Sequence, residues 1–291
     1  MTDRATVVLV VGALHHDILV ETDHLPRRDE TAVGARWYPK FGGKGGNQAV
    51  AVAANGGMSR MVGAVGDDGF GAFLRDRLAA SGVDDRHVAI LPGAASGMSV
   101  AIMDRAGDYA ATIVSGANLL IPVAAVQDPL VWHDVGLLVL QNEVPEAVNI
   151  AAATEARRRS IPTVLNAAPW RELSATLTRL VDILVVNAVE AEMMGAAPVC
   201  CLHGAADAAR KLADRFETVI VTAGALGLAA WSAADEHFTL PAEKVEVESS
   251  HGAGDSFVGA LAAGLARGVD FRAACAAASH AAALHVAGRA A

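Results

Sequence analysis

Short apolar segments alternate with helical segments along the second half of the chain, and this order constrains the fold more than any other feature. We expect strands at residues 137–140, 163–166, 183–186 and 218–222, and helices at residues 145–159, 173–180, 190–194 and 205–215. Strands separated by helices pair in parallel, because a helical crossover returns the chain to the same edge of the sheet. The order predicts an α/β fold with a doubly wound, mostly parallel sheet and helices on both faces.

The first half of the chain predicts further strands of this sheet and two excursions from it. Apolar runs at Val7–Val11 and Met61–Val65 predict buried strands, and residues 70–81 predict a helix. Residues 18–40 and 98–114 combine β-forming residues with turn residues, so each predicts a hairpin away from the main core. We expect one α/β domain over residues 1–291. The last elements expected are a hairpin at residues 227–240 and helices after Gly254 and at residues 271–286.

Composition excludes several classes of partner. A net charge of −9 disfavours nucleic acid and anionic membranes as partners. No segment approaches the uninterrupted apolar length of a membrane helix. The three cysteines form neither a disulfide framework nor a zinc pattern. We therefore expect no nucleic-acid or membrane partner and a reducing, cytoplasmic location.

A glycine turn before a helix is the first motif with chemical content. Gly252 and Gly254 precede apolar residues at helical spacing, and Asp255 lies at the start of that helix. Unpaired N–H groups at a helix start can bind phosphate. Asp255 could cap the helix, or it could take a proton from a hydroxyl that attacks a phosphoryl group. The turn lacks the third glycine of a dinucleotide fingerprint, because Phe257 occupies that position.

A second glycine block lies early in the chain. Four glycines surround Lys44 and precede Asn47 at residues 42–47, and an alanine-rich helix is expected from Gln48. Gly45 follows Lys44 where a Walker motif would have Ser or Thr. The block could be a flexible turn. Its polar residues favour instead a loop that lets the backbone approach a small polar molecule.

Together the two blocks resemble the signatures of the ribokinase-like (PfkB) carbohydrate kinases, and the resemblance covers nearly the whole chain. Supporting segments follow in the order of that family at residues 12–17, 66–68, 115–118, 141–143, 166–169, 187–190 and 222–224. The resemblance implies a small β lid formed by roughly residues 15–40 and 97–115. It also implies use of ATP and Mg²⁺ to phosphorylate a primary hydroxyl of a pentose, with ribose as the first candidate, and pairing of two copies through the lid.

The resemblance assigns roles to individual residues. It implies that Asp255 is the catalytic base and that the N–H groups of Gly252, Ala253 and Gly254 form an anion hole. Residues implied to bind the sugar are Asp17, Gly43, Lys44, Asn47 and Glu143, with His15 beside them. Residues implied to bind the nucleotide are Asn187, Thr222, Ala223, Gly224, Gly227, Leu228 and His280. Glu190 is implied to hold Mg²⁺ through water, although it could also be an ordinary acid at a helix start.

Three departures from the family pattern leave alternatives open. His15 replaces an asparagine of the ribose-specific pattern, so another sugar or a nucleoside is an alternative acceptor. Ser249 replaces an acid that helps to form a site for a monovalent cation. The chain also ends at Ala291, before further cation-site residues of the family. We therefore expect weak activation by K⁺ or none. The last two departures also leave open a catalytically silent sugar-binding sensor.

Overall fold

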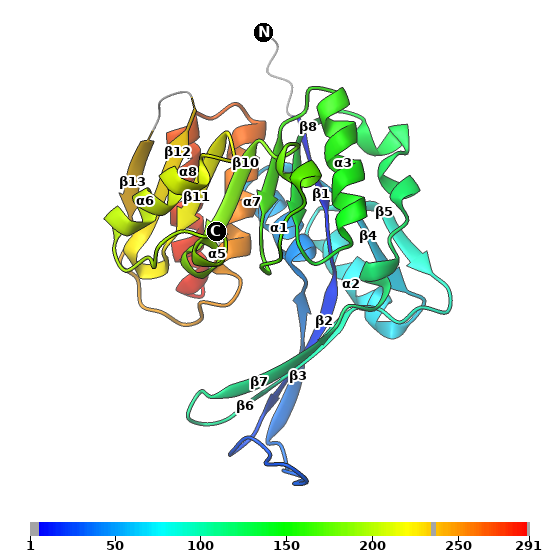
Figure 1. The fold of residues 1–291 in the computed structure, drawn as a ribbon. Helices are drawn as coiled ribbons and strands as arrows, with labels where there is room; N and C mark the ends of the chain where they lie inside the picture. The colour runs from blue at the N-terminus through cyan, green and yellow to red at the C-terminus, as the bar shows by residue number, and fades with distance from the viewer. Residues whose placement is uncertain (1–5, 234–236, 290–291) are drawn as a thin grey trace.

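The computed structural model describes residues 6–233 and 237–289, and its main feature is a nine-stranded sheet (Figure 1). Neighbouring strands are parallel except where β12 and β13 join the edge antiparallel. The prediction of a doubly wound, mostly parallel sheet is thus confirmed. In spatial order the strands are β13 (His237–Pro241), β12 (Gly227–Ser232), β11 (Thr218–Thr222), β10 (Ile183–Asn187), β9 (Thr163–Asn166), β8 (Val135–Gln141), β1 (Val7–Val11), β4 (Met58–Gly66) and β5 (Asp84–Leu91).

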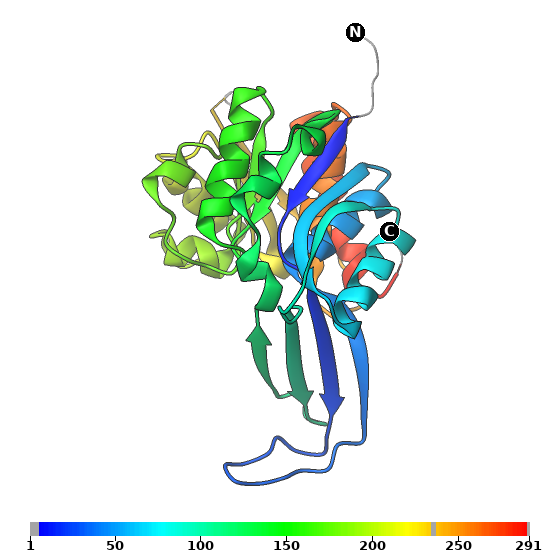
Figure 2. The same ribbon diagram turned by 90° about the vertical axis from the view of Figure 1, so that its right-hand side faces the viewer.

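Helices cover both faces of this sheet (Figures 1 and 2). Strand β1 shows why both faces are buried, because Leu9 and Val11 belong to one apolar cluster and Val8 and Val10 to the other. The helices of the first cluster are α3 (Glu146–Arg158), α4 (Ala175–Thr178), α5 (Ala188–Met193) and α6 (Leu202–Leu212), with the 3₁₀ turns η1 (Gly116–Leu120), η2 (Val123–Val126) and η3 (Pro129–Trp132). Those of the second are α1 (Lys44–Ala54), α2 (Gly69–Ala80), α7 (Ala253–Ala266) and α8 (Phe271–Val286).

A second, four-stranded sheet projects from this body, as both views of the ribbon show (Figures 1 and 2). We call it the lid sheet. Its strands, in spatial order, are β3 (Arg36–Gly42), β2 (His15–Glu21), β6 (Met98–Met103) and β7 (Tyr109–Val114). The two predicted hairpins are confirmed, and the parallel pair β2–β6 joins them into one sheet. Strand β2 follows β1 after three residues, so the lid is continuous with the centre of the body.

Three local predictions were wrong in their bounds or missed an element. Helix α1 begins at Lys44, so Gly45 and Gly46 lie inside its first turn rather than in a loop. Close packing explains these glycines, because a Cβ on Gly45 would lie 2.6 Å from the Gly12 carbonyl carbon. The helix expected at residues 173–180 is a single turn, α4. Strand β5 was missed because it is an edge strand with polar residues at half of its positions.

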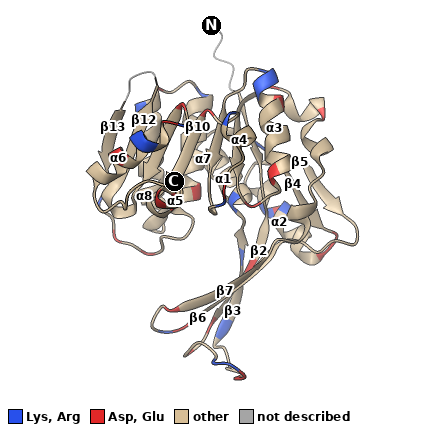
Figure 3. Cartoon of the chain, viewed as in Figure 1, with Lys and Arg blue, Asp and Glu red and all other residues tan. Residues whose placement is uncertain are grey.

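Acidic and basic residues are scattered over the body and the lid sheet (Figure 3). Within the part of the chain that the structure describes, no helix has both the length and the apolar character needed to cross a membrane.

Candidate active site

Asp255 lies in the first turn of α7, directly after the glycine turn. Gly252 adopts a left-handed conformation, with φ of 89°, which redirects the chain into the helix. The Asp255 carboxylate is buried, with 6% of the residue exposed. The N–H groups of Gly252 and Gly254 have no acceptor among the described residues, whereas the Ala253 N–H donates to the Ser250 carbonyl at 3.3 Å. The turn therefore presents two unpaired N–H donors next to a buried carboxylate.

Two neighbouring amides of α1 hold the Asp255 carboxylate. Asn47 Nδ2 donates to Oδ2 at 3.1 Å, and Gln48 Nε2 donates to Oδ1 at 2.9 Å. Gln48 is fully buried and also donates to Asn166 Oδ1 at 3.1 Å. Its own Oε1 accepts from Gln141 Nε2 at 2.7 Å. A chain of buried amides thus fixes the orientation of Asp255 from the sheet below it.

The start of α1 brings a second carboxylate into the site. The backbone N–H of Lys44 donates to Glu143 Oε2 at 2.7 Å, where Gly43 before it has φ of 86°. Burial raises the pKa of the Glu143 carboxyl, while His15 and the Lys44 N–H act in the opposite direction. Gly43 cannot be replaced by a larger residue here, because a Cβ would lie 2.6 Å from the Ala13 carbonyl oxygen.

The lid sheet contributes Asp17 and His15 from strand β2. Ser99 Oγ of β6 donates to Asp17 Oδ1. The Asp17 carboxylate lies over Gly42, where a Cβ would come within 2.0 Å of Oδ2. His15 is buried, and its Nε2 has no hydrogen-bond partner among the described residues. Buried polar atoms without partners are rare, so this one fits a polar ligand.

Asn142, beside Glu143 at the end of β8, is a similar case. It is buried with 7% exposure, and neither atom of its side-chain amide has a partner within the described residues. Strand β8 therefore ends in polar groups that the protein itself leaves unpaired. This is the edge of a parallel sheet at which ligands bind.

Asn187 and Glu190 form a capping box at the start of α5. Asn187 Oδ1 accepts from the Glu190 N–H at 2.8 Å, and Glu190 Oε2 accepts from the Asn187 N–H at 2.9 Å. Burial raises the pKa of Glu190, and the nearby Asp255 charge acts in the same direction. Both side chains thus have a local structural use. Among the described residues, no group of three His, Cys, Asp or Glu side chains could hold a metal ion.

The remaining predicted nucleotide residues lie around the ends of β11 and β12. Thr222 Oγ1 donates to the Val186 carbonyl at 3.4 Å. Ala223 precedes the 3₁₀ turn η4 (Gly224–Leu226), in which Gly224 has φ of 55° and open space around its Cβ position. Gly227 is required by packing, because a Cβ would lie 2.0 Å from the Leu240 carbonyl oxygen. Leu228 is buried in the core, so only its backbone could reach a ligand.

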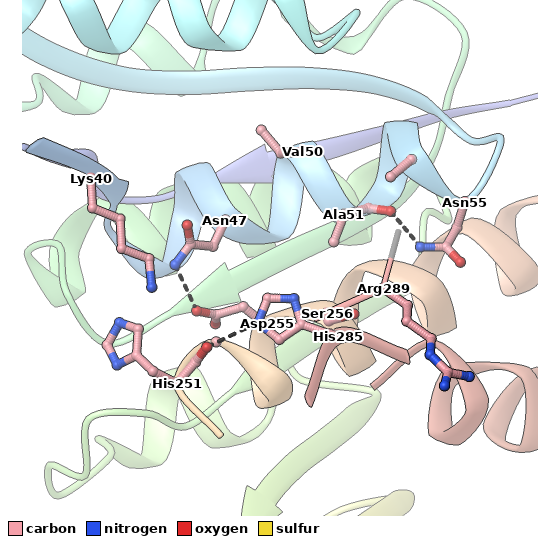
Figure 4. Close-up of a pocket in the computed structure, with 12 residues that line it drawn as sticks. Lys40, Asn47, Val50, Ala51, Asn55, His251, Asp255, Ser256, His285 and Arg289 are labelled. Atoms are coloured by element: carbon pink, nitrogen blue, oxygen red, sulfur yellow. Dashed lines mark hydrogen bonds between the residues drawn. The ribbon is translucent and has the colours of Figure 1, made fainter. Parts of the chain in front are cut away.

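His280 of α8 lies apart from the buried groups. Its Nδ1 is 2.9 Å from Glu243 Oε1, and 56% of its side chain is exposed. Nearer the turn, His285 Nε2 lies 2.9 Å from the His251 carbonyl oxygen, where the ring packs against Gly252. A cavity of about 240 Å³ opens here between α1, the turn and α8 (Figure 4).

A comparison with known protein families gives this arrangement its context. The sequence model of the pfkB family carbohydrate kinases matches residues 5–291. The chain belongs to this family. It is therefore a carbohydrate kinase, as its two glycine motifs predicted.

Individual relatives agree with the family assignment. The chain is 33% identical to the ribokinase of Mus musculus over 266 residues, covering 89% of this chain and 82% of that protein. It is 32% identical to the ribokinase of Bacillus subtilis over 280 residues, with 96% and 92% covered. A deoxyribokinase of Salmonella typhi is 31% identical over 258 residues, with 88% and 84% covered. A solved structure of the Arabidopsis thaliana ribokinase with ribose and ATP has a TM-score of 0.90 at 26% identity, with 97% and 93% covered.

The fold of this kinase gathers the predicted residues in two groups. The first group is linked through contacts of the lid sheet, α1, β8 and α7. Its members are Asp17, Gly43, Lys44, Asn47, Glu143 and Asp255. The second group lies at the ends of β10, β11 and β12 and on α8. Sequence reasoning missed the role of Gln48 and Gln141 in holding Asp255. A signal was present, since Gln48 is the first polar residue of an otherwise alanine- and valine-rich helical run.

Proposed function

We propose that this kinase transfers the γ-phosphate of ATP to the primary hydroxyl of ribose, giving ribose 5-phosphate. One observation carries the proposal: a buried carboxylate, Asp255, lies beside the unpaired N–H groups of Gly252 and Gly254. The choice of ribose rests on the relatives named ribokinase and on the related structure that holds ribose and ATP.

In this proposal Asp255 accepts the proton of the attacking hydroxyl. The hydroxyl oxygen forms a bond to the γ-phosphorus while the bond from phosphorus to the leaving ADP oxygen breaks. The N–H groups of the glycine turn stabilise the negative charge of the group in transfer. Asn47 and Gln48 keep Asp255 in position, because both amides donate to its oxygens.

Hydroxyl groups of the sugar are assigned to the buried polar groups next to Asp255. Asp17, Glu143 and Asn47 supply carboxylate and amide groups, and Gly43 and Lys44 shape the first turn of α1 around them. The unpaired Nε2 of His15 fits a hydroxyl partner. A sugar that lacks the matching hydroxyl would leave such a group buried and unpaired, which gives stereochemical discrimination. Closing of the lid sheet would exclude water that could otherwise take the phosphate.

The nucleotide is assigned to the second group of residues. Its binding site would be lined by Thr222, Ala223, Gly224, Gly227, the backbone of Leu228 and His280. Its phosphates would face Asn187 and Glu190. Mg²⁺, when bound, would neutralise charge on those phosphates. Glu190 is assigned a contact through water, made by the oxygen that does not accept from the Asn187 N–H. Mg²⁺ commonly keeps several waters and takes its other ligands from the phosphates.

Residues 1–291 are proposed to act as one domain that pairs with a second copy through the lid sheet. Apolar side chains of the lid are exposed, among them Trp37, Tyr109 and Ile113. A second copy could cover them and the free edge strands. A monomer in light scattering at micromolar concentration would contradict the pairing. A cytoplasmic location is proposed as well, in line with the exposed adjacent thiols of Cys200 and Cys201.

A panel of acceptors tests the proposed function. ADP release would be followed with Mg-ATP and ribose, 2-deoxyribose, other pentoses, ketoses and nucleosides, and ³¹P NMR would identify the product. We expect the highest kcat/KM for ribose and no turnover by Asp255→Asn. A higher kcat/KM for a nucleoside than for ribose would contradict the proposal.

A different acceptor in the same class is the second candidate. His15 favours it, because an imidazole offers another size and another hydrogen-bond pattern than an amide. The relative named deoxyribokinase gives a concrete case. If 2-deoxyribose exceeds ribose in the panel, this candidate replaces the first. Sugar binding in calorimetry without ADP release would indicate the silent sensor instead.

A further inference from the structure

Lys40 is a cation of the lid sheet that the proposed function does not use. It lies on β3 two residues before Gly42, and its Cα pairs with that of Asp17 on β2. Directly paired residues of antiparallel strands present their side chains on the same face. Residues two apart on one strand share a face as well, and Asp17 lies over Gly42. Lys40 therefore belongs to the face of the lid that turns towards the candidate active site.

No protein group neutralises this lysine. It is half-buried, and its ammonium has no hydrogen bond or ion pair within residues 6–233 and 237–289. Asp17, its cross-strand neighbour, accepts from Ser99. Removing an ammonium from water without a counter-charge is unfavourable. The position therefore suits an anion that the protein itself does not supply.

The side chain points into the same cavity as the catalytic carboxylate. Lys40, Asn47, His251, Gly252 and Asp255 all line this cavity of about 240 Å³. Figure 4 shows the Lys40 ammonium directed from the lid side towards Asp255 and the His251 ring. The charge of Lys40 acts on the side chains of this cavity. Burial lowers the pKa of His251, and the charge of Lys40 lowers that pKa further. The Lys40 ammonium and the glycine turn thus border the same cavity as the Asp255 carboxylate.

We propose that Lys40 is a further catalytic residue, which contacts the phosphoryl group during its transfer and the phosphate of the product. The lid would bring this charge to the group from β3, while the N–H donors of Gly252 and Gly254 would reach it from the glycine turn. Lys40 takes no part in the proton transfer to Asp255. The inference rests on the proposed function. It adds that the lid recognises the phosphoryl group in transfer and the phosphate of the product.

Two other uses of Lys40 make different predictions. As a ligand of sugar hydroxyls, Lys40 would affect the binding of ribose and of ribose 5-phosphate alike. As a surface lysine, it would affect neither. A contact with the phosphoryl group predicts a loss that is confined to phosphorylated ligands and to turnover.

The test compares Lys40→Met with Lys40→Arg and a control. Arg36→Met is the matched control, because Arg36 is on the same strand and face but pairs with Glu21 at the other end of β3. Calorimetry would measure binding of ribose, ribose 5-phosphate and inorganic phosphate, and the ADP assay would give kcat and KM.

For Lys40→Met we expect affinity for ribose 5-phosphate and phosphate to fall roughly tenfold or more and kcat to fall about 10²-fold, as for loss of one charge-stabilising contact. Ribose affinity should stay within about twofold, since the lost contact involves only the phosphate. Lys40→Arg should restore most of the loss, and Arg36→Met should match the wild type.

Three outcomes would overturn the inference. These are wild-type phosphate affinity in Lys40→Met, an equal loss of ribose affinity, or no binding of either phosphate ligand to the wild type. Failure of the proposed acceptor looks different. If the wild type binds phosphate through Lys40 but does not phosphorylate ribose, the acceptor is wrong and the role of Lys40 stands.

Discussion

The two sides of Asp255 are built in different ways. On the side assigned to the acceptor, buried groups from distant parts of the chain contact one another directly. Gln48 and Asp255, for example, are 207 residues apart in sequence. On the side assigned to the nucleotide, the side-chain contacts of Asn187, Glu190 and His280 are local or exposed. Asn187 and Glu190 are three residues apart, and His280 meets Glu243 at the surface.

This difference indicates where selectivity comes from. The buried amide of Gln48 donates to Asp255 and Asn166 and accepts from Gln141, so it fixes the geometry around Asp255. A ligand on that side must match polar groups that are already in place. The other side offers mainly backbone and glycine conformations, such as that of Gly224, which can follow the shape of a phosphate chain. We expect mutations on the acceptor side to cost more.

Asp255→Asn should have the largest effect, because an amide cannot accept the proton of the attacking hydroxyl. We expect kcat to fall by about 10³-fold or more, while ATP affinity changes by no more than a few-fold, in keeping with loss of a general base. ADP release and calorimetry measure the two quantities. Asp270→Asn is the matched control, since Asp270 caps the next helix, α8, outside the site. Full activity of Asp255→Asn would remove Asp255 from its role.

Gln48→Leu tests whether the amide chain positions Asp255. Leucine has a similar volume but no donor, so Asp255 Oδ1 and Gln141 Nε2 each lose their Gln48 partner. We expect kcat to fall about 10–100-fold with the KM for ATP unchanged, and the free energy of unfolding to fall by about 1–3 kcal/mol for groups left unpaired. Steady-state kinetics and urea denaturation measure both. Gln127→Leu, at an exposed position, is the control. An unchanged kcat would show that Asn47 alone orients the base.

His280→Ala should have a smaller effect, on the other side. The ring is exposed and meets only Glu243 among the described residues, so its removal takes little from the fold. We expect the KM for ATP to rise by roughly two- to fivefold and kcat to stay within about twofold, as for loss of a surface contact that contributes about 0.5–1 kcal/mol. His203→Ala is the control, because His203 is also exposed beside an acid, on α6. A loss in kcat as large as that of Gln48→Leu would contradict the comparison.

The sequence predicted the elements with clear periodicity and the motifs with unusual glycines. Strands β1, β9 and β11 and helix α8 match their expected bounds, and β6 and β7 fill the hairpin expected at residues 98–114. The start of α1 was missed because glycines disfavour a helix by propensity alone, whereas here close packing against Gly12, Leu14 and Phe41 requires them. The link from Gln141 through Gln48 to Asp255 could not be read from one sequence, because it depends on which strands and helices meet in space.

The smallest effect expected is that of the monovalent cation. The backbone polar groups of His251, in the turn before α7, already have partners within the protein. The His251 carbonyl lies 2.9 Å from His285 Nε2, and the His251 N–H donates to Ser249 Oγ at 3.3 Å. A cation would have to compete with His285 for that carbonyl, and Ser249 brings no negative charge to attract it. Ala291 lies outside the described residues, so the expectation here rests on His251, His285 and Ser249.

Exchange of Na⁺ for K⁺ at constant ionic strength should therefore change kcat and the KM for ATP by less than about twofold, because the turn is already held in place. The same exchange of Na⁺ for K⁺ in His285→Ala tests the role of the imidazole, because this variant leaves the His251 carbonyl without His285 as its partner. A gain of K⁺ sensitivity in His285→Ala would show that the imidazole holds the turn in the wild type. A several-fold activation of the wild-type enzyme by K⁺ would contradict the expectation, and it would mean that the turn is set by an ion rather than by the contacts of α8.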